Sequence, residues 1–379
     1  MSLQFIFGNS GSGKSHYLYQ QIVEESIRHP EKNYLVLVPE QFTMQTQKDL
    51  CMAHPRGGIM NIDVLSFGRL AHRVFEETGK ERQPILDDEG KNLVLRKIAG
   101  NYEDELTVLK GNLKKQGYIS EVKSVISEFT QYGIDFEQLD SFMEGLNPES
   151  YLYYKLKDIR KVYEGFEDYL RDKYITKEEL LDVLSQTVAE AKMLKDSVIA
   201  MDGFTGFTPV QNRLIGELLK VCDKIMLTVE MDRREDPFVY KHPYQLFALS
   251  KQMVTSLTEV AQEVKVEIDE PVWLCKNPPY RFKENPEMAF LEEELFRYSR
   301  RKYSGEKMQS ISLHEVHTPQ EEAQYVTEEI QKKLDQGIKP GEIAVLFRAA
   351  VQARMISEIL SEHRIPFEMR DYVTNFYRH

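Results

Sequence analysis

Residues 8–15, which read Gly-Asn-Ser-Gly-Ser-Gly-Lys-Ser, constrain this chain more than any other stretch. They match the phosphate-loop pattern G-x-x-x-x-G-K-[ST] at every fixed position. The apolar residues 3–7 before them have the length of a strand, and a helix-competent segment begins at Lys14. Glycines allow backbone N–H groups to turn towards phosphate oxygens, and a helix N-terminus adds partial positive charge. The sequence therefore predicts a strand, a phosphate-binding loop and a helix.

The side chains of this loop have separate expected roles. Lys14 is placed to bridge the phosphates of a bound nucleotide, and the Ser15 hydroxyl is placed to ligand Mg²⁺. The alternative is a flexible Gly/Ser turn without a ligand. The predicted nucleotide-binding residues are Gly8, Asn9, Ser10, Gly11, Ser12, Gly13, Lys14 and Ser15.

Composition narrows the class of protein. The chain has 379 residues, enough for about two or three domains, and its 41% hydrophobic and 29% charged residues are ordinary for a globular protein. No apolar run reaches the roughly 18 residues that a membrane-spanning helix needs. A strand that starts near residue 3 argues against a secretion signal. The three cysteines, Cys51, Cys222 and Cys275, are far apart, so we expect a reduced, cytoplasmic protein without structural disulfide or zinc.

The hydrophobic pattern predicts an α/β fold that is interrupted by a helical insertion. Apolar runs at residues 34–38 and 61–65 indicate buried parallel strands, and Ser66 is a candidate helix N-cap. From 87 to 195 the strand pattern stops, and a capping box at residues 176–179 starts one of several amphipathic segments. The tyrosines of this insertion could stack on nucleobases, but their helical spacing favours core packing. They are Tyr151, Tyr153, Tyr154, Tyr163, Tyr169 and Tyr174.

The sheet resumes with an apolar run at residues 197–201 that ends at Asp202. An acidic residue at the tip of a buried strand is the form of a Walker B carboxylate, which holds Mg²⁺ through water; the alternative is an ordinary turn residue. A capping box at residues 208–211, with proline at the first helical position, and a strand at 224–229 follow. Ligands of such sheets lie at the carboxyl ends of the strands, where residues 8 and 202 both fall.

The net charge of −12, from 49 basic and 61 acidic residues, predicts weak non-specific affinity for DNA but allows a local basic groove. The main basic cluster lies in residues 266–309, which are rich in proline and which we expect to be irregular. It either faces a phosphate backbone or is a solvated surface with interleaved glutamates. Its members are Arg281, Lys283, Arg297, Arg300, Arg301, Lys302 and Lys307.

A second α/β unit closes the chain. We predict strands at residues 310–313 and 343–347, with a helix between them that starts at a capping box at 318–321. Arg348 follows the second of these strands, either as a functional residue or as an ordinary surface arginine.

Several stretches together carry a family resemblance. They are the phosphate loop, Val-Pro-Glu-Gln-Phe-Thr at 38–43, Val-Leu-Ser-Phe-Gly-Arg-Leu-Ala at 64–71, Met-Asp-Gly-Phe-Thr-Gly-Phe-Thr-Pro-Val-Gln at 201–211 and Ile-Ala-Val-Leu-Phe-Arg at 343–348. The chain resembles the N-terminal part of the B subunit of AddAB-type ATP-dependent helicase–nucleases, a degenerate relative of superfamily 1 helicases. The resemblance covers nearly the whole chain.

The resemblance implies a domain plan. Residues 1–86 and 196–265 would form a first RecA-like domain, 87–195 its helical insertion, 266–309 an irregular basic linker, and 310–379 part of a second RecA-like domain. ATP with Mg²⁺ would bind between the two RecA-like domains, with Arg348 reaching the γ-phosphate. The implied partners are double- and single-stranded DNA and a motor helicase–nuclease A subunit, in double-strand break repair.

This sequence departs from active relatives in ways that limit the expected chemistry. Those motors have Asp-Glu where this chain has Asp202-Gly203, so the general base is absent at that position. Loss of a positioned base typically costs about 10²–10⁴ in rate, so we expect ATP binding with little hydrolysis. Three cysteines cannot hold a four-cysteine iron–sulfur cluster. The family's nuclease domain and later helicase motifs are also missing, so we expect a part of a longer subunit.

Two other functions stay open from the sequence. One is a free-standing phosphate-loop kinase of a small metabolite, against which the long insertion and the second α/β unit argue. The other is a structural subunit with a vestigial phosphate loop, which would bind no nucleotide.

Overall fold

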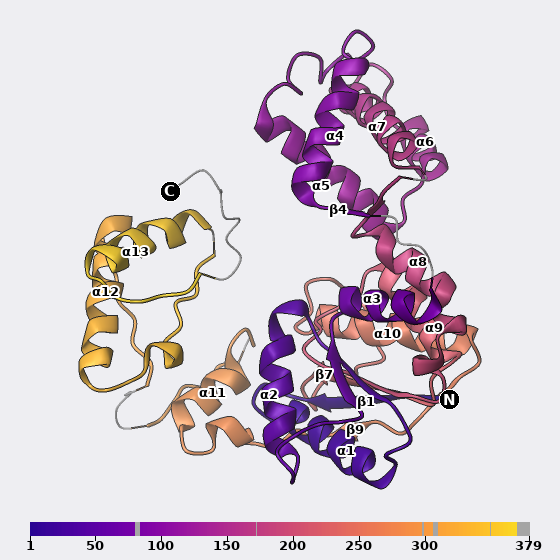
Figure 1. Cartoon of the computed structure of the whole chain (residues 1–379). Coiled ribbons are helices and arrows are strands. Elements are labelled where there is room, and N and C mark those ends of the chain that lie inside the picture. Colours follow the sequence, from indigo (N-terminus) through magenta and orange to yellow (C-terminus); the bar gives the residue numbers. More distant parts are fainter. Residues whose placement is uncertain (80–83, 172, 298, 306–309, 349, 370–379) are drawn as a thin grey trace. The chain divides into compact units, whose positions relative to one another are not determined.

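The computed structural model describes residues 1–79, 84–171, 173–297, 299–305, 310–348 and 350–369 (Figure 1). The chain divides into two compact units, Met1–Tyr303 and Ser304–His379. Lys307 of the predicted basic cluster lies outside the described residues. Among the helices of the described part, none combines the length and the apolar character that crossing a bilayer requires.

The first unit is built on a parallel sheet with the strand order β3-β2-β6-β7-β1-β8, and β9 also pairs with β1. The strands predicted near residues 3, 34, 61, 197 and 224 are all confirmed. The strands are β1 (Ser2–Gly8), β2 (Tyr34–Leu37), β3 (Ile62–Leu65), β6 (Val198–Met201), β7 (Lys224–Glu230), β8 (Glu267–Ile268) and β9 (Val272–Trp273). The predicted α/β class with a parallel sheet is therefore confirmed.

Helices cover both faces of this sheet because side chains of the strands alternate between two apolar cores. One core contains α1 (Lys14–Arg28) and α2 (Thr43–Ala53), and the other contains α3 (Phe67–Thr78), α8 (Glu179–Thr187), α9 (Pro209–Leu219) and α10 (Ala248–Glu263). Figure 1 shows α3, α9 and α10 on the side of the sheet opposite to α1. The predicted caps form: Ser66 accepts from the Arg69 N–H, and Thr208 and Gln211 make a capping box.

The insertion has an apolar core of its own, formed by α4 (Asp88–Asn101), α5 (Gln116–Tyr132) and α7 (Tyr151–Leu170), with Phe136 of α6 (Phe136–Glu144) packed against it. Tyr163 is buried in this core, and Tyr169 and Tyr174 pack against it, whereas Tyr151 is 71% exposed. The core-packing interpretation therefore holds for part of the tyrosine set.

The prediction that residues 87–195 contain only helices is wrong at one strand. β5 (Ile175–Thr176) lies in this range and pairs in parallel with β4 (Ile85–Leu86), which comes just before it in the sequence. Two residues per strand are too few to leave a readable alternation in the sequence. Thr176 and Glu179 exchange the hydrogen bonds predicted for a capping box, but α8 begins only at Glu179, with Glu178 as its N-cap.

The segment 266–309 also differs from its prediction as an irregular stretch. β8 and β9 extend the main sheet beside β1, and α11 (Pro286–Glu294) follows. The strands are short and interrupted by prolines, which hid them from pattern reading. The 3₁₀ helices are η1 (Glu40–Phe42), η2 (Val188–Glu190), η3 (Lys192–Leu194), η4 (Tyr280–Phe282) and η5 (Pro340–Glu342).

In the second unit, α12 (Pro319–Asp335) and α13 (Ala350–Glu362) pack around Ile330, Leu360 and Ile365. Thr318 caps α12 by accepting from the Glu321 N–H, which is one half of the predicted capping box. The Glu321 Oε2 accepts from the His317 N–H in place of the Thr318 N–H. The strands predicted at 310–313 and 343–347 are wrong for the described residues, because neither segment pairs with a neighbour. Leu313 and Leu346 are 98% and 94% exposed, so the apolar runs do not gain the burial that defines an inner strand.

Candidate phosphate-binding site

The predicted phosphate loop lies between the carboxyl end of β1 and the N-terminus of α1. Its glycines are required by its shape. Gly11 and Gly13 have φ angles of +74° and +92°, which favour glycine, and a Cβ at Gly8 would lie 2.3 Å from the Ser12 Oγ. Within the loop, the Ser12 N–H donates to the Asn9 carbonyl at 3.2 Å. The backbone thus folds as the motif predicted.

Some polar atoms of this loop are buried without a hydrogen-bond partner in the described part of the chain. The Ser12 Oγ and the Asn9 Oδ1 accept or donate no hydrogen bond within the described structure. The Lys14 Nζ donates to the Asn9 carbonyl at 3.0 Å, and within the described residues it makes no ion pair. Burial lowers the pKa of Lys14, while the negative charges of Glu230 and Asp202 act in the opposite direction. Such groups fit an anionic ligand that would supply the missing partners.

Asp202 follows β6 at the same edge of the sheet, and it is 7% exposed. Its Oδ2 accepts from the Tyr19 hydroxyl of α1 at 2.7 Å, and its Oδ1 accepts from the Thr228 hydroxyl of β7. The structure therefore brings Asp202 to the α1 side of the sheet. Ser15 is exposed at the start of α1. The assignment of both residues to Mg²⁺ stays a prediction.

The described residues contain no group of three or more His, Cys, Asp or Glu side chains that could hold a metal by themselves. Mg²⁺ is commonly held by one or two protein ligands together with waters and nucleotide phosphates. Ser15 and Asp202 supply a hydroxyl and a carboxylate oxygen of the kind that such an arrangement uses.

Arg348, the predicted γ-phosphate contact, lies in the second unit. Its side chain is exposed, and its backbone N–H donates to the Gln352 Oε1 at 3.2 Å. Its approach to the phosphate loop stays a prediction.

Sequence reasoning missed a segment that lies directly against the loop. The Arg281 N–H donates to the Gly11 carbonyl at 3.0 Å, and the Asn9 Nδ2 donates to the Glu292 Oε2 at 3.0 Å. A Cβ at Gly11 would come within 2.7 Å of the Arg281 Cβ. This places an exposed arginine beside the loop. Because the contact joins residues about 270 positions apart, no local pattern could signal it.

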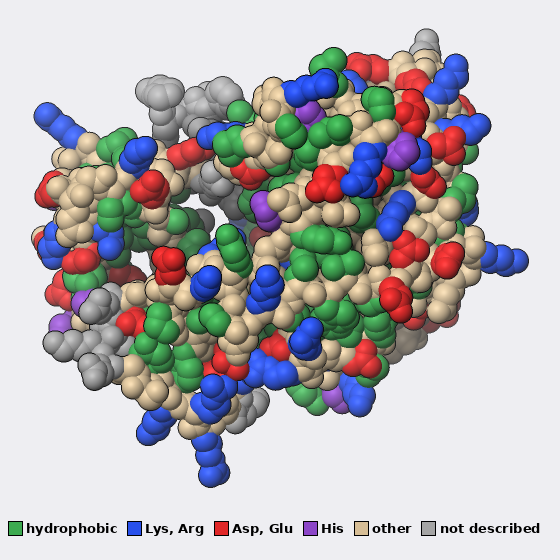
Figure 2. Space-filling view, turned by 90° about the horizontal axis from the view of Figure 1, so that it is seen from below, with side chains coloured by type: hydrophobic (Ala, Val, Ile, Leu, Met, Phe, Trp, Pro, Cys, Tyr) green, Lys and Arg blue, Asp and Glu red, His purple; other side chains and the backbone are tan. Residues whose placement is uncertain are grey.

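The rest of the basic cluster does not form one free patch. Arg297 pairs with Asp232 at 2.7 Å, and Arg301 pairs with Glu294 at 2.6 Å. On the face drawn in Figure 2, Lys and Arg side chains are interspersed with Asp and Glu. The solvated, ion-paired interpretation therefore describes these arginines.

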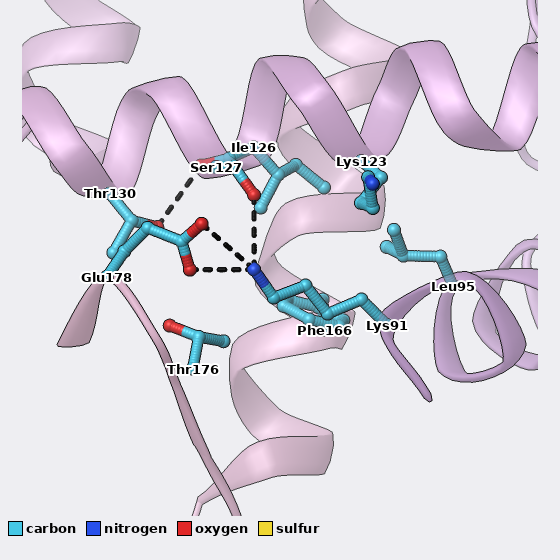
Figure 3. A pocket seen from close by; sticks show the side chains of 9 residues that line it. All are labelled: Lys91, Leu95, Lys123, Ile126, Ser127, Thr130, Phe166, Thr176 and Glu178. Atoms are coloured by element: carbon cyan, nitrogen blue, oxygen red, sulfur yellow. Dashed lines mark hydrogen bonds and ion pairs between the residues drawn. The ribbon is translucent and has the colours of Figure 1, made fainter. Parts of the chain in front are cut away.

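A second polar site, which we call the Lys91 pocket, lies in the insertion (Figure 3). Lys91 is 2% exposed, and its Nζ donates to both carboxylate oxygens of Glu178, at 2.9 and 2.7 Å, and to the Ser127 Oγ at 3.4 Å. Its charge is satisfied by the protein, so it ties α4 and α5 to the chain returning from the insertion. The pocket is lined by Lys91, Leu95, Lys123, Ile126, Ser127, Thr130, Phe166, Thr176 and Glu178.

Comparisons with known proteins agree with the resemblance read from the motifs. The family model described as ADDB, N-terminal, matches residues 5–292, and the model described as UvrD-like helicase C-terminal domain matches residues 283–379. The second match supports a superfamily 1 helicase-like fold.

Individual relatives agree with these models. The B subunit of the ATP-dependent helicase/deoxyribonuclease of Lachnoclostridium phytofermentans is 41% identical over 337 residues, which are 88% of this chain and 29% of the relative. Proteins of the same name from Clostridium perfringens and Ruminiclostridium cellulolyticum are each 31% identical, over 97% and 99% of this chain and 31% and 33% of their own lengths. This chain thus spans about a third of these relatives. Since the first model covers most of the chain, the chain belongs to the AddB family.

Proposed function

We propose that this chain is the helicase-like N-terminal portion of one subunit of an ATP-dependent helicase–nuclease that acts in double-strand break repair and recombination. It binds ATP at residues 8–15. The observation that carries this proposal is the phosphate loop itself, with the Ser12 Oγ buried and unpartnered and Lys14 without an ion pair in the described structure.

The chain's own residues have distinct roles towards the nucleotide. Lys14 neutralises the phosphates, and backbone N–H groups of the loop donate to them. Ser15 and Asp202 would hold Mg²⁺. Bound Mg²⁺ would supply charge neutralisation at the phosphates. Tyr19 and Thr228 fix the Asp202 carboxylate in place.

Hydrolysis at this site is slow, because the usual base is replaced. Gly203 carries no carboxylate, and its φ is +76°. A Cβ there would face Pro39 and Phe42, at 3.6 and 3.7 Å. Loss of a positioned base costs about 10²–10⁴ in rate.

The domain plan and partners are part of this proposal. Residues 1–86 and 196–265 act as the first RecA-like domain, with 87–195 as its insertion and residues from 310 as part of a second RecA-like domain that brings Arg348 to the γ-phosphate. The relatives are named as B subunits of a helicase/deoxyribonuclease, which supports DNA and a further subunit as partners. A motor A subunit as that partner and a cytoplasmic location are part of the proposal.

Calorimetric titration of the chain with Mg-ATP tests the proposal. We expect saturable binding that Lys14→Ala weakens by at least about 100-fold, since it removes the cation from the site. Lys48→Ala, an exposed lysine on α2, is the matched control and should bind as the wild type does. A folded wild-type chain that binds no nucleotide would contradict the proposal, and phosphoryl transfer to a small metabolite would favour the kinase alternative.

A further inference from the structure

Glu230 ends the strand that separates the phosphate loop from Asp202. β7 lies between β1 and β6 in the sheet, and Glu230 is in register with Gly8, the first residue of the loop. The following N–H, of Met231, donates to the Gly8 carbonyl at 2.9 Å. Since ligands of parallel sheets bind at the carboxyl ends of the strands, Glu230 lies at the centre of that edge.

The alternation of β7 shows which face of the sheet Glu230 takes. Residues of one parity enter the core that contains α3, α9 and α10: these are Ile225, Leu227 and Val229. Met226, of the other parity, packs in the core that contains α1, and Thr228 donates to Asp202. Glu230 follows Thr228 by two positions, so it lies on the α1 face. Asp202 takes the same face, because it contacts Tyr19 of α1.

The geometry of the sheet places Glu230 at the phosphate site. It is in register with Gly8 on the neighbouring strand, and it shares the α1 face of the sheet with Asp202.

The carboxylate of Glu230 is also not engaged by other side chains of the described residues. Its side chain is exposed, and in the described part of the chain it makes no ion pair and no side-chain hydrogen bond. Both carboxylate oxygens of Asp202 already accept hydroxyl groups, and Glu292 accepts from Asn9. Gly203 carries no carboxylate and its added Cβ would face Pro39. Of the acidic side chains near Lys14, the Glu230 carboxylate is therefore the one left to accept a proton from water.

We propose that Glu230 is the general base of the residual ATP hydrolysis, a role that rests on nucleotide binding at residues 8–15. Its carboxylate takes a proton from a water molecule as the water oxygen bonds to the γ-phosphorus. The bond from the γ-phosphorus to the bridging oxygen breaks, and ADP leaves with that electron pair, which gives ADP and inorganic phosphate. Glu230 later returns the proton to solvent.

The test compares Glu230→Gln with wild type in two measurements. Single-turnover hydrolysis should fall by about 10²-fold or more, as expected for loss of a base. Calorimetric affinity for Mg-ATP should rise a few-fold, because a negative charge beside the phosphates is removed. Glu267→Gln changes an exposed glutamate of β8 at the opposite edge of the sheet, and it should alter neither quantity. Thermal melting confirms that each variant is folded.

The outcomes separate this inference from the proposed function. Unchanged hydrolysis in a folded Glu230→Gln variant, or ATP binding by the wild type with no hydrolysis at all, overturns the role of Glu230 and leaves nucleotide binding intact. Absence of binding in the wild type overturns the proposed function itself. Partial hydrolysis by Glu230→Asp, which keeps the carboxylate but shortens its reach, supports the assignment.

Discussion

The phosphate loop holds a half-buried lysine and the Lys91 pocket holds a buried one, but the two sites satisfy the charge of the lysine in different ways. Lys91 meets both oxygens of Glu178 and the hydroxyl of Ser127. Lys14 meets one backbone carbonyl, beside a Ser12 hydroxyl that has no partner in the described structure. Buried polar groups of folded proteins are normally satisfied, so an incomplete set indicates a place for a ligand and a complete set indicates a structural tie.

The two sites differ because their hydrogen-bond partners come from different distances along the chain. The Lys91 pocket joins α4 to Glu178, 87 positions away along the chain, so one contact fixes the outgoing and returning ends of the insertion. The loop is built from eight consecutive residues, which satisfy one another only in part: the Ser12 N–H and the Lys14 Nζ both donate to the Asn9 carbonyl. The Ser12 Oγ and the Asn9 Oδ1 have no partner in the described structure, so they can interact with a ligand.

The largest expected effect on stability comes from removing the ion pair between Lys91 and Glu178. Lys91→Met leaves Glu178 without its cation in a largely buried place, and we expect the free energy of unfolding to fall by about 3 kcal/mol. Urea denaturation measures it. Lys123→Met is the matched control: Lys123 lies at the same pocket but pairs with the mostly exposed Asp88, so its loss should stay below about 1 kcal/mol. Equal losses of unfolding free energy in the two variants would show that the buried Lys91 ion pair is no more important for stability than the partly exposed one of Lys123.

A smaller effect is expected from restoring a carboxylate beside Asp202. Gly203→Glu forces a φ near +76° on a side chain, which costs about 1–2 kcal/mol. It should not raise ATP hydrolysis, because the added group starts towards Pro39 and Phe42. Gly203→Ala separates the strain from the carboxylate and should lose similar stability. Faster hydrolysis in Gly203→Glu alone would show that position 203 can supply the base.

The sequence could predict what is encoded locally. The loop, five strands and the caps at Ser66, Thr208 and Thr318 each depend on a few adjacent residues, and all of these elements form. The position of Asp202 at the same edge of the sheet as the loop could also be predicted, because the carboxyl ends of parallel strands lie at one edge.

The features that could not be predicted from the sequence depend on contacts between residues far apart in the chain. β4, β5, β8 and β9 are two-residue strands, which exist only because a neighbour pairs with them. The apolar run at 343–347 has the composition of a strand but no partner in the described residues. The contacts of Arg281 and Glu292 with the loop join the two ends of the first unit, and no spacing rule reports them.

Glu167, which is half-buried in α7, is a polar group of a third kind. Burial, with the negative charge of Glu179, raises the pKa of Glu167 in the insertion to about 7. The folded state therefore holds this proton more tightly than the unfolded state, so stability falls as pH rises from about 4.5 to about 7. Glu167→Gln should remove that slope and stabilise the chain by about 1 kcal/mol above this range. Urea titrations on both sides of the range measure it. Glu164→Gln, on the exposed side of the same helix, should leave the slope in place.

The smallest effect is expected from two hydroxyl groups, one with a partner and one without a partner in the described structure. Ser127→Ala removes an acceptor from Lys91 and should cost about 0.5–1 kcal/mol of stability, without changing affinity for Mg-ATP. Ser12→Ala removes a buried hydroxyl that has no partner in the described structure, so stability should stay within about 0.5 kcal/mol, while affinity for Mg-ATP falls a few-fold. Urea denaturation and calorimetry of the two variants measure both quantities. A larger loss of stability in Ser12→Ala than in Ser127→Ala would mean that the loop satisfies its own polar groups, and the contrast between ligand site and structural tie would then fail.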